Sequence, residues 1–195
     1  MSDTDRPILQ VIVGSTRPGR AGLPVGRWIC GRAREHGGFD VELVDLAEVG
    51  LPLFDEPHHP RLKRYTHEHT RRWSATVDRA DAFVFVVPEY NHSINAATKN
   101  AIDHLNSEWA HKPAGLVSYG GVAGGTRAVT ALEPVLNALR MTPLPGVIVP
   151  FVAQFVHGEG DERTFEPNDE IAAGAKAMLD ELARVAPALR SLRAG

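Results

Sequence analysis

Three short segments of this 195-residue chain combine residue types that bind anions and flat rings. The first is Gly14-Ser15-Thr16-Arg17-Pro18-Gly19-Arg20, which directly follows the apolar run Ile8–Val13. Hydroxyl and guanidinium groups in a glycine-containing turn, placed before a helix whose first N–H groups lack partners, suit a phosphate. The segment lacks the lysine of a nucleotide P-loop and the spaced glycines of a dinucleotide fold. A turn with surface arginines is the alternative interpretation.

The second segment is Pro88-Glu89-Tyr90-Asn91-His92-Ser93, which follows a strongly apolar run. Tyr90 suits stacking against a flat heteroaromatic ligand, and Asn91 suits hydrogen bonding to the edge of such a ring. A turn that caps the next helix through Ser93 or Asn95 is the alternative, and the two interpretations are compatible.

The third segment, Gly120-Gly121-Val122-Ala123-Gly124-Gly125, has almost no side chains. Backbone N–H groups in such a segment can approach a planar ring closely. A plain flexible loop is the alternative.

The elements that must position these segments are strands and helices in alternation, which predicts a parallel sheet covered on both faces. The expected strands are residues 8–13, 40–45, 82–87, 114–118 and 146–149. The continuously apolar third run suits a central strand and the charged second run suits an edge, which favours the order 2-1-3-4-5. In such a sheet the three segments meet at the carboxyl ends of the strands, where the winding reverses.

Helical periodicity predicts a helix over residues 95–106 and a last helix capped by Asn168. Pro134 lies in the expected fourth helix, which it should kink or restart. The apolar run 151–156 suits either a subunit interface or packing under the last helix. The apolar stripe of the last helix consists of Ile171, Ala175, Met178, Leu179, Leu182 and Leu189.

Length, composition and charge limit the classes of protein to which this chain can belong. Length predicts one domain over residues 1–195, and 43% hydrophobic with 23% charged residues is ordinary globular usage. A net charge of −3 without a basic stripe argues against a nucleic-acid partner. The charged N-terminal segment and the lack of a run of ~20 apolar residues argue against a membrane segment and predict a cytoplasmic location.

Two residue types offer chemistry that we do not expect this chain to use. The lone cysteine, Cys30, falls in a helical pattern and is predicted to be a buried, inert thiol. The four histidines of one region lack cysteine partners and helical metal-ligand spacing, so a solvated loop and helix start is expected there rather than a metal site. His92 is expected either at a pocket entrance or in solvent, and His104 against its own helix. The four are His58, His59, His67 and His69.

The three segments, together with Lys99-Asn100-Ala101-Ile102-Asp103, resemble the NADPH-dependent FMN reductase family, which includes azo, quinone and chromate reductases. Order and spacing agree from residue 8 to about residue 139. The resemblance implies a flavodoxin-like three-layer αβα sandwich, FMN held non-covalently, and a homodimer or homotetramer. Asn95 departs from the proline that relatives often carry.

The resemblance also implies roles for particular residues. Those implied to hold the phosphate are Ser15, Thr16, Arg17 and Arg20, with the backbone near Gly22 and Leu23. Those implied to flank the flavin ring are Pro88, Glu89, Tyr90 and Asn91, and those along its other edge are Ser118, Gly120 and Gly121.

The implied function is an FMN-dependent NAD(P)H oxidoreductase that passes a hydride from NADPH through FMN to a small acceptor: a flavin, a quinone, an azo compound or a metal oxyanion. No acid-base residue is then required, because the flavin carries the chemistry. A flavodoxin-like electron carrier and a non-redox FMN-binding module are the alternatives, although carriers are usually more acidic. A low-molecular-weight phosphatase would need a cysteine in the first loop, where this chain has none.

Overall fold

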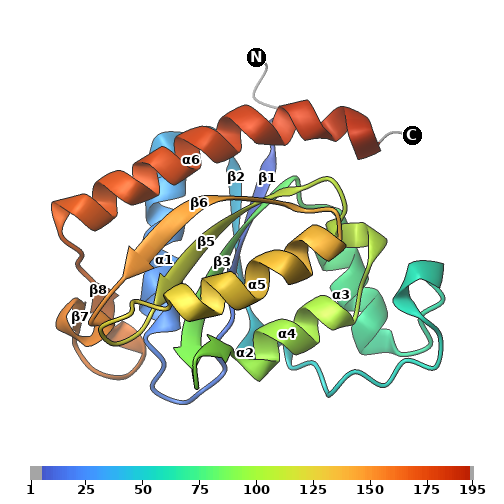
Figure 1. The fold of residues 1–195 in the computed structure, drawn as a ribbon, viewed down its shortest axis with the longest axis horizontal. Coiled ribbons are helices and arrows are strands. Elements are labelled where there is room, and N and C mark those ends of the chain that lie inside the picture. The colour runs from blue at the N-terminus through green and yellow to red at the C-terminus, as the bar shows by residue number, and fades with distance from the viewer. Residues whose placement is uncertain (1–5, 194–195) are drawn as a thin grey trace.

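The computed structural model describes residues 6–193, so residues 1–5 of the N-terminal segment lie outside the described residues. A central sheet lies between two layers of helices (Figure 1). Five of its strands run parallel in the order β2-β1-β3-β5-β6. They are β1 (Ile8–Val13), β2 (Asp40–Asp45), β3 (Ala82–Tyr90), β5 (Pro113–Tyr119) and β6 (Thr142–Val149). The flavodoxin-like prediction is confirmed, with β3 central and β2 at an edge.

The sheet differs from the prediction in its strand count. A sixth, two-residue strand β4 (Ser93–Ile94) pairs antiparallel with the end of β3, so the order 2-1-3-4-5 becomes 2-1-3-5-6. A separate hairpin, β7 (Val156–His157) and β8 (Thr164–Phe165), follows the sheet. Neither element could be recognised from a hydrophobic pattern, because two residues carry no period.

The last sheet strand begins four residues earlier than residue 146. Thr142 starts β6, and its two prolines are tolerated because β6 is an edge strand that need not donate on its outer side. Gly146 lies in a bulge of β6, where Pro145 and Gly146 stand opposite Leu116 of β5, and an added Cβ on Gly146 would lie 1.9 Å from Leu116 O. Proline and glycine therefore mark an irregular edge strand here and not a loop.

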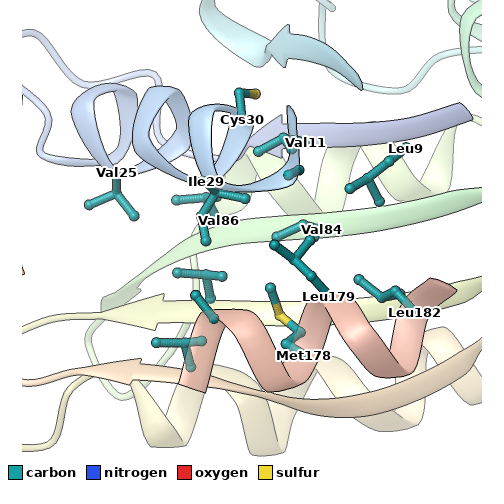
Figure 2. Close-up of a cluster of buried hydrophobic side chains, with 14 of the residues drawn as sticks. Leu9, Val11, Val25, Ile29, Cys30, Val84, Val86, Met178, Leu179 and Leu182 are labelled. Atoms are coloured by element: carbon teal, nitrogen blue, oxygen red, sulfur yellow. The ribbon is translucent and has the colours of Figure 1, made fainter. Parts of the chain in front are cut away.

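Two apolar clusters hold the layers together, one on each face of the sheet. Helices α1 (Gly22–His36) and α6 (Asp169–Arg190) cover one face, where Val25, Ile29, Met178 and Leu179 interdigitate above β1 and β3 (Figure 2). The other face is covered by α3 (Glu68–Asp78), α4 (Ala96–Asp103) and α5 (Thr126–Ala138), with the short α2 (Leu46–Val49) beside them. Strands buried on both sides require the continuous apolar runs seen in the sequence.

Several helix predictions are confirmed and others are wrong. Asn168 caps α6 by accepting from the Ile171 N–H (3.0 Å), as predicted. Helix α4 covers residues 96–103 instead of 95–106, and α5 runs through Pro134 without restarting. Among residues 6–193, every helix is too short or too polar to span a bilayer.

Cys30 is buried on α1, and burial raises the pKa of its thiol to about 11, as expected of an inert cysteine. In the run 151–156, Val152, Phe155 and Val156 pack against the cluster formed with α1 and α6, whereas Phe151 is half exposed at φ 49°. Packing beneath the helical layer accounts for these three residues, and a subunit interface at the exposed residues of the run stays a prediction.

Candidate active site

The first predicted segment leaves the sheet at Gly14, directly after β1. The Gly14 N–H donates to Val86 O (2.9 Å), and Asn95 Nδ2 donates to Gly14 O (2.7 Å). An added Cβ at Gly14 would lie 2.1 Å from Thr98 Oγ1, so only glycine fits where this segment approaches α4. Asn95 directly precedes α4, but its side chain donates to Gly14 O and makes no capping hydrogen bond to the helix. Ser93 lies in β4. The prediction that Ser93 or Asn95 caps this helix is therefore wrong.

Residues 17–20 form a tight turn that has the features of type II. Pro18 occupies the second position, Gly19 adopts φ 70° in the third, and the Arg20 N–H donates to Arg17 O (3.1 Å). Within the described chain, the N–H groups of Ser15, Thr16 and Arg17 meet no protein acceptor. Helix α1 starts immediately afterwards, so free donors gather at the positive end of a helix.

The two arginines of this segment differ in their surroundings. Arg17 is exposed. Arg20 forms a largely buried salt bridge to Asp45 at the end of β2, and its Nε is buried without a partner. Arg20 is therefore held in place by Asp45, and only part of its guanidinium is available to a ligand.

The second segment begins inside β3. Pro88, Glu89 and Tyr90 continue the strand, and the chain then turns at Asn91 and His92 with φ values of 49° and 65°. The Tyr90 hydroxyl lies 2.8 Å from Ser15 Oγ, which ties the end of β3 to the first segment. Tyr90, Asn91 and His92 are all exposed, so this turn forms a rim and not a buried wall.

Glu89 has a partner that the sequence did not indicate. Its carboxylate accepts from Arg127 Nε (2.6 Å) and from the Arg127 N–H (3.2 Å) at the start of α5. Hydrogen bonds from Arg127 hold the pKa of Glu89 below its ordinary value. Glu89 is thus an ionised clamp between β3 and α5.

The third segment folds back on the sheet. The Ser118 hydroxyl is fully buried and donates to Gly124 O (2.9 Å), and Gly124 and Gly125 adopt φ values of 57° and 88°. Among the described residues, the N–H groups of Gly121 and Val122 have no protein acceptor. Ser118 therefore supports the loop, and the backbone supplies the free donors.

Tyr119 stands directly before Gly120 of the third segment, but the sequence assigned it no role in the site. Burial raises the pKa of its hydroxyl well above the ordinary value. The nearby Ser15 hydroxyl acts in the opposite direction and lowers the pKa of Tyr119. Ser15 Oγ forms its hydrogen bond with the Tyr90 hydroxyl, however, and the buried Tyr119 hydroxyl is left without a hydrogen-bond partner in the described part of the chain. An added Cβ on Gly22 would lie 2.6 Å from the Tyr119 hydroxyl oxygen, which places that oxygen against the first residue of α1. A tyrosine at the carboxyl end of a central strand, next to Gly120, was the available signal.

A cavity of about 150 Å³ lies where the three segments meet. Seven predicted residues line it and six do not. Of the six, Ser118 is turned into the glycine loop, and Thr16 lines a neighbouring cavity of about 460 Å³. Ala21, Tyr119 and Val152 complete the lining. The seven are Ser15, Arg17, Arg20, Pro88, Glu89, Tyr90 and Gly120; the six are Thr16, Gly22, Leu23, Asn91, Ser118 and Gly121.

A larger cavity, about 820 Å³, lies elsewhere, between the chain around Pro57 and the C-terminal parts of α4 and α5. Its lining is mainly apolar, with Ile102, Leu105, Val135 and Leu139 among its residues. Its lining contains none of the residues of the three predicted segments. We therefore place the candidate active site in the smaller cavity, where the anion-binding and ring-binding features coincide.

The four histidines of residues 58–69 and His104 do not line this cavity. His58 and His59 line the large cavity, the rings of His67 and His69 stack at 5.2 Å, and His104 is buried with Nδ1 2.8 Å from Asn100 O. His104 thus packs on its own helix, as predicted. Among the side chains described in residues 6–160 and 162–193, no group of three His, Cys, Asp or Glu could hold a metal ion.

Comparison with known proteins gives a consistent result. The family model described as NADPH-dependent FMN reductase matches residues 8–155. The chain is 37% identical over 153 residues to the NAD(P)H-dependent FMN reductase ntnL of a Nectria species, covering 74% of this chain and 76% of that one. It is 41% identical over 141 residues to an NAD(P)H-dependent FMN reductase of Schizosaccharomyces pombe, covering 71% and 70%.

A solved structure supports the fold. FerB, a flavoenzyme NAD(P)H:(acceptor) oxidoreductase from Paracoccus denitrificans, superposes with a TM-score of 0.72 at 21% identity, covering 93% of this chain and 97% of that one. The matched residues 8–155 contain all three segments of the candidate site. The chain belongs to the NADPH-dependent FMN reductase family.

Proposed function

We propose that the protein is an FMN-dependent NAD(P)H oxidoreductase that reduces a small acceptor. Family membership supports this proposal, and the observation that carries it is the meeting of a donor-rich loop, a tyrosine rim and a side-chain-free loop in one cavity. When bound, FMN would supply the redox chemistry by taking a hydride from NADPH and passing electrons to the acceptor.

The phosphate end of the cofactor fits the first segment. Free N–H groups at residues 15–17, the start of α1 and the exposed Arg17 together offer donors and positive charge. The unsatisfied Tyr119 hydroxyl faces the same helix start, and a buried hydroxyl without a partner is rare unless a ligand completes it. Ser15 and Arg20 would contribute contacts, with the backbone of Gly22 and Leu23, while Thr16 would contribute through its N–H.

The ring end fits the second and third segments. Pro88 and Tyr90 offer flat apolar surface, and the N–H groups of Gly121 and Val122 are free to donate to ring oxygens. Donors aimed at the ring stabilise negative charge that develops on reduction. Glu89 and Ser118 would act indirectly, by holding α5 and the glycine loop, and Asn91 would sit at the rim.

Absorption spectroscopy of the purified protein tests this proposal. A yellow protein that oxidises NADPH in the presence of a quinone, an azo dye, free flavin or a ferric salt supports it. Yellow protein without turnover supports the electron carrier or the non-redox FMN-binding module instead. Colourless protein that does not bind added FMN would refute all three.

The acceptor and the coenzyme preference follow from the same experiment. An open, ring-stacking site admits several flat acceptors, so we propose a broad acceptor range, measured as kcat/KM across the panel. We also propose NADPH over NADH, tested by steady-state rates with both coenzymes. Arg127, a candidate contact for the coenzyme phosphate, is held by Glu89 and is therefore fixed in position.

We propose a homodimer or homotetramer in which a second copy covers the cavity of about 820 Å³. Its wall is mainly apolar, and contact with a second copy would remove this apolar surface from water. Val135→Glu, which puts a carboxylate on the cavity wall, should lower the oligomer mass in light scattering, because burying an unpaired charge is costly. Asn137→Glu, on the same helix but off the lining, is the matched control.

Two further predictions from the sequence stay proposals. We propose that residues 1–195 form one domain, which a single cooperative unfolding transition would support. The cytoplasmic location is tested by fractionating cells that express the tagged chain.

A further inference from the structure

The hairpin β7–β8 follows the part of the chain that the family model matches, and it reaches the first segment of the candidate site. Arg163, just before β8, donates from Nη1 to Gly19 O (3.0 Å) and from Nη2 to Arg20 O (3.1 Å). Its Nε donates to Gly160 O (3.1 Å) inside the hairpin. One guanidinium thus joins two carbonyls of the phosphate-type turn to a segment more than 140 residues away in the chain.

The hairpin is anchored firmly enough to act as a support. The Phe165 ring packs edge-on against Trp28 of α1, with centroids 5.2 Å apart, and against Phe155 at 6.1 Å. The Glu166 N–H also donates to Phe155 O (2.8 Å). In Figure 1 the hairpin lies beside the end of α1 that starts at Gly22.

Arg163 binds backbone carbonyl oxygens, whereas a phosphate needs backbone N–H groups. The guanidinium occupies carbonyl oxygens at residues 19 and 20, while the N–H groups at residues 15–17 stay free. Elsewhere the loop is held at Gly14, at Ser15 through Tyr90, and through the side chain of Arg20 on Asp45. The exposed turn at Gly19 has no other described partner beyond its own Arg17–Arg20 hydrogen bond.

We propose that Arg163 is a positioning residue for phosphate recognition: it fixes the turn at residues 17–20 so that the loop presents its N–H groups to the FMN phosphate. This inference rests on the proposed FMN binding. Preorganised donors bind more tightly because less ordering is required when the ligand arrives. The planar fork of arginine suits two adjacent carbonyls, which a single ammonium group cannot match as well.

Comparison of FMN with riboflavin tests the inference, because riboflavin carries the same ring without the phosphate. Arg163→Gln should raise the Kd of the apo-protein for FMN about tenfold, the effect of losing ~1.4 kcal/mol, and leave the Kd for riboflavin unchanged. Arg163→Lys should give a smaller rise. Arg184→Gln, which removes an exposed guanidinium bonded only to Glu181, is the matched control.

Hydrogen exchange of the apo-protein gives a second readout that needs no flavin. In Arg163→Gln, faster exchange is expected at the Arg20 amide, whose hydrogen bond to Arg17 O closes the turn. An equal loss of FMN and riboflavin affinity, or no loss of either, would overturn the inference, as would faster exchange spread over the whole fold. A wild-type protein that binds neither flavin would instead refute the proposed function.

Discussion

Replacing Tyr119 with phenylalanine should stabilise the apo-protein and weaken its binding of FMN. The hydroxyl is buried without a completed hydrogen bond in the unliganded protein. An unsatisfied buried hydroxyl costs roughly 1–3 kcal/mol, and its proximity to Ser15 offsets part of this, so we expect Tyr119→Phe to gain about 1 kcal/mol. For a chain of this length that gain raises Tm by about 2–4 °C.

The effect on FMN has the opposite sign. A hydroxyl that donates to a charged phosphate contributes about 1.5–3 kcal/mol, so its loss should raise the Kd for FMN about 10- to 100-fold. Fluorescence quenching of FMN measures the Kd, and calorimetry of the apo-protein measures Tm.

Tyr65 provides the matched control because its hydroxyl is satisfied. It donates to Glu108 Oε1 at 2.8 Å, and the carboxylate of Glu108 is fully buried. Tyr65→Phe should therefore destabilise the protein and leave the affinity for FMN unchanged. If Tyr119→Phe lowers Tm as Tyr65→Phe does and binds FMN normally, the assignment of the Tyr119 hydroxyl to the phosphate is wrong.

Three other perturbations test the site and the packing around it. Arg17→Ala should raise the Kd for FMN by a factor that corresponds to about 1.5–3 kcal/mol, seen in the same titration, and unchanged affinity would contradict the phosphate assignment. Burial lowers the pKa of Lys112 to about 8, below the unfolded value of about 10.4, so the unfolded state binds more protons in this window and stability rises with pH between them. Urea unfolding at pH 7.5 and 9.5 should show this rise in the wild type, by about 1–2 kcal/mol, and not in Lys112→Met. Burial alone would raise the pKa of Glu56, but hydrogen bonds from the backbone N–H groups of residues 66 and 67 outweigh it and lower the pKa to about 2. Acidification from pH 4.5 towards 2 should therefore destabilise the wild type more than Glu56→Gln, and parallel acid titrations of the two proteins would contradict this.

The candidate site could be predicted in outline because its key positions depend on local geometry. Pro18 and Gly19 specify their turn by their own backbone preferences, and Gly14 follows the end of a buried strand. The apolar content of the strands likewise reflects burial on both faces. Such signals depend on residues that are adjacent in the sequence, so they can be recognised without knowledge of the rest of the fold.

The sequence did not indicate partners that come from far along the chain. Glu89 and Arg20 both line the cavity, as the predicted site requires, but Arg127 binds Glu89 and Asp45 binds Arg20. Ser118 has a hydroxyl of the expected kind, turned away into its own loop. The type of a residue determines what its side chain is able to bind. The direction in which the side chain points depends on the donor or acceptor that the fold places nearest to it.

The sequence by itself determined the fold class and the order of the parallel strands, because hydrophobic period and turn chemistry are local properties that add along the chain. The family followed from the resemblance of its three segments to known motifs. Only the tertiary structure decided that Tyr119 has a buried hydroxyl without a completed hydrogen bond, and that Arg163 reaches back to the first loop. Both depend on distances between segments that are remote in sequence. Those distances are set by packing on the sheet, which no local pattern records.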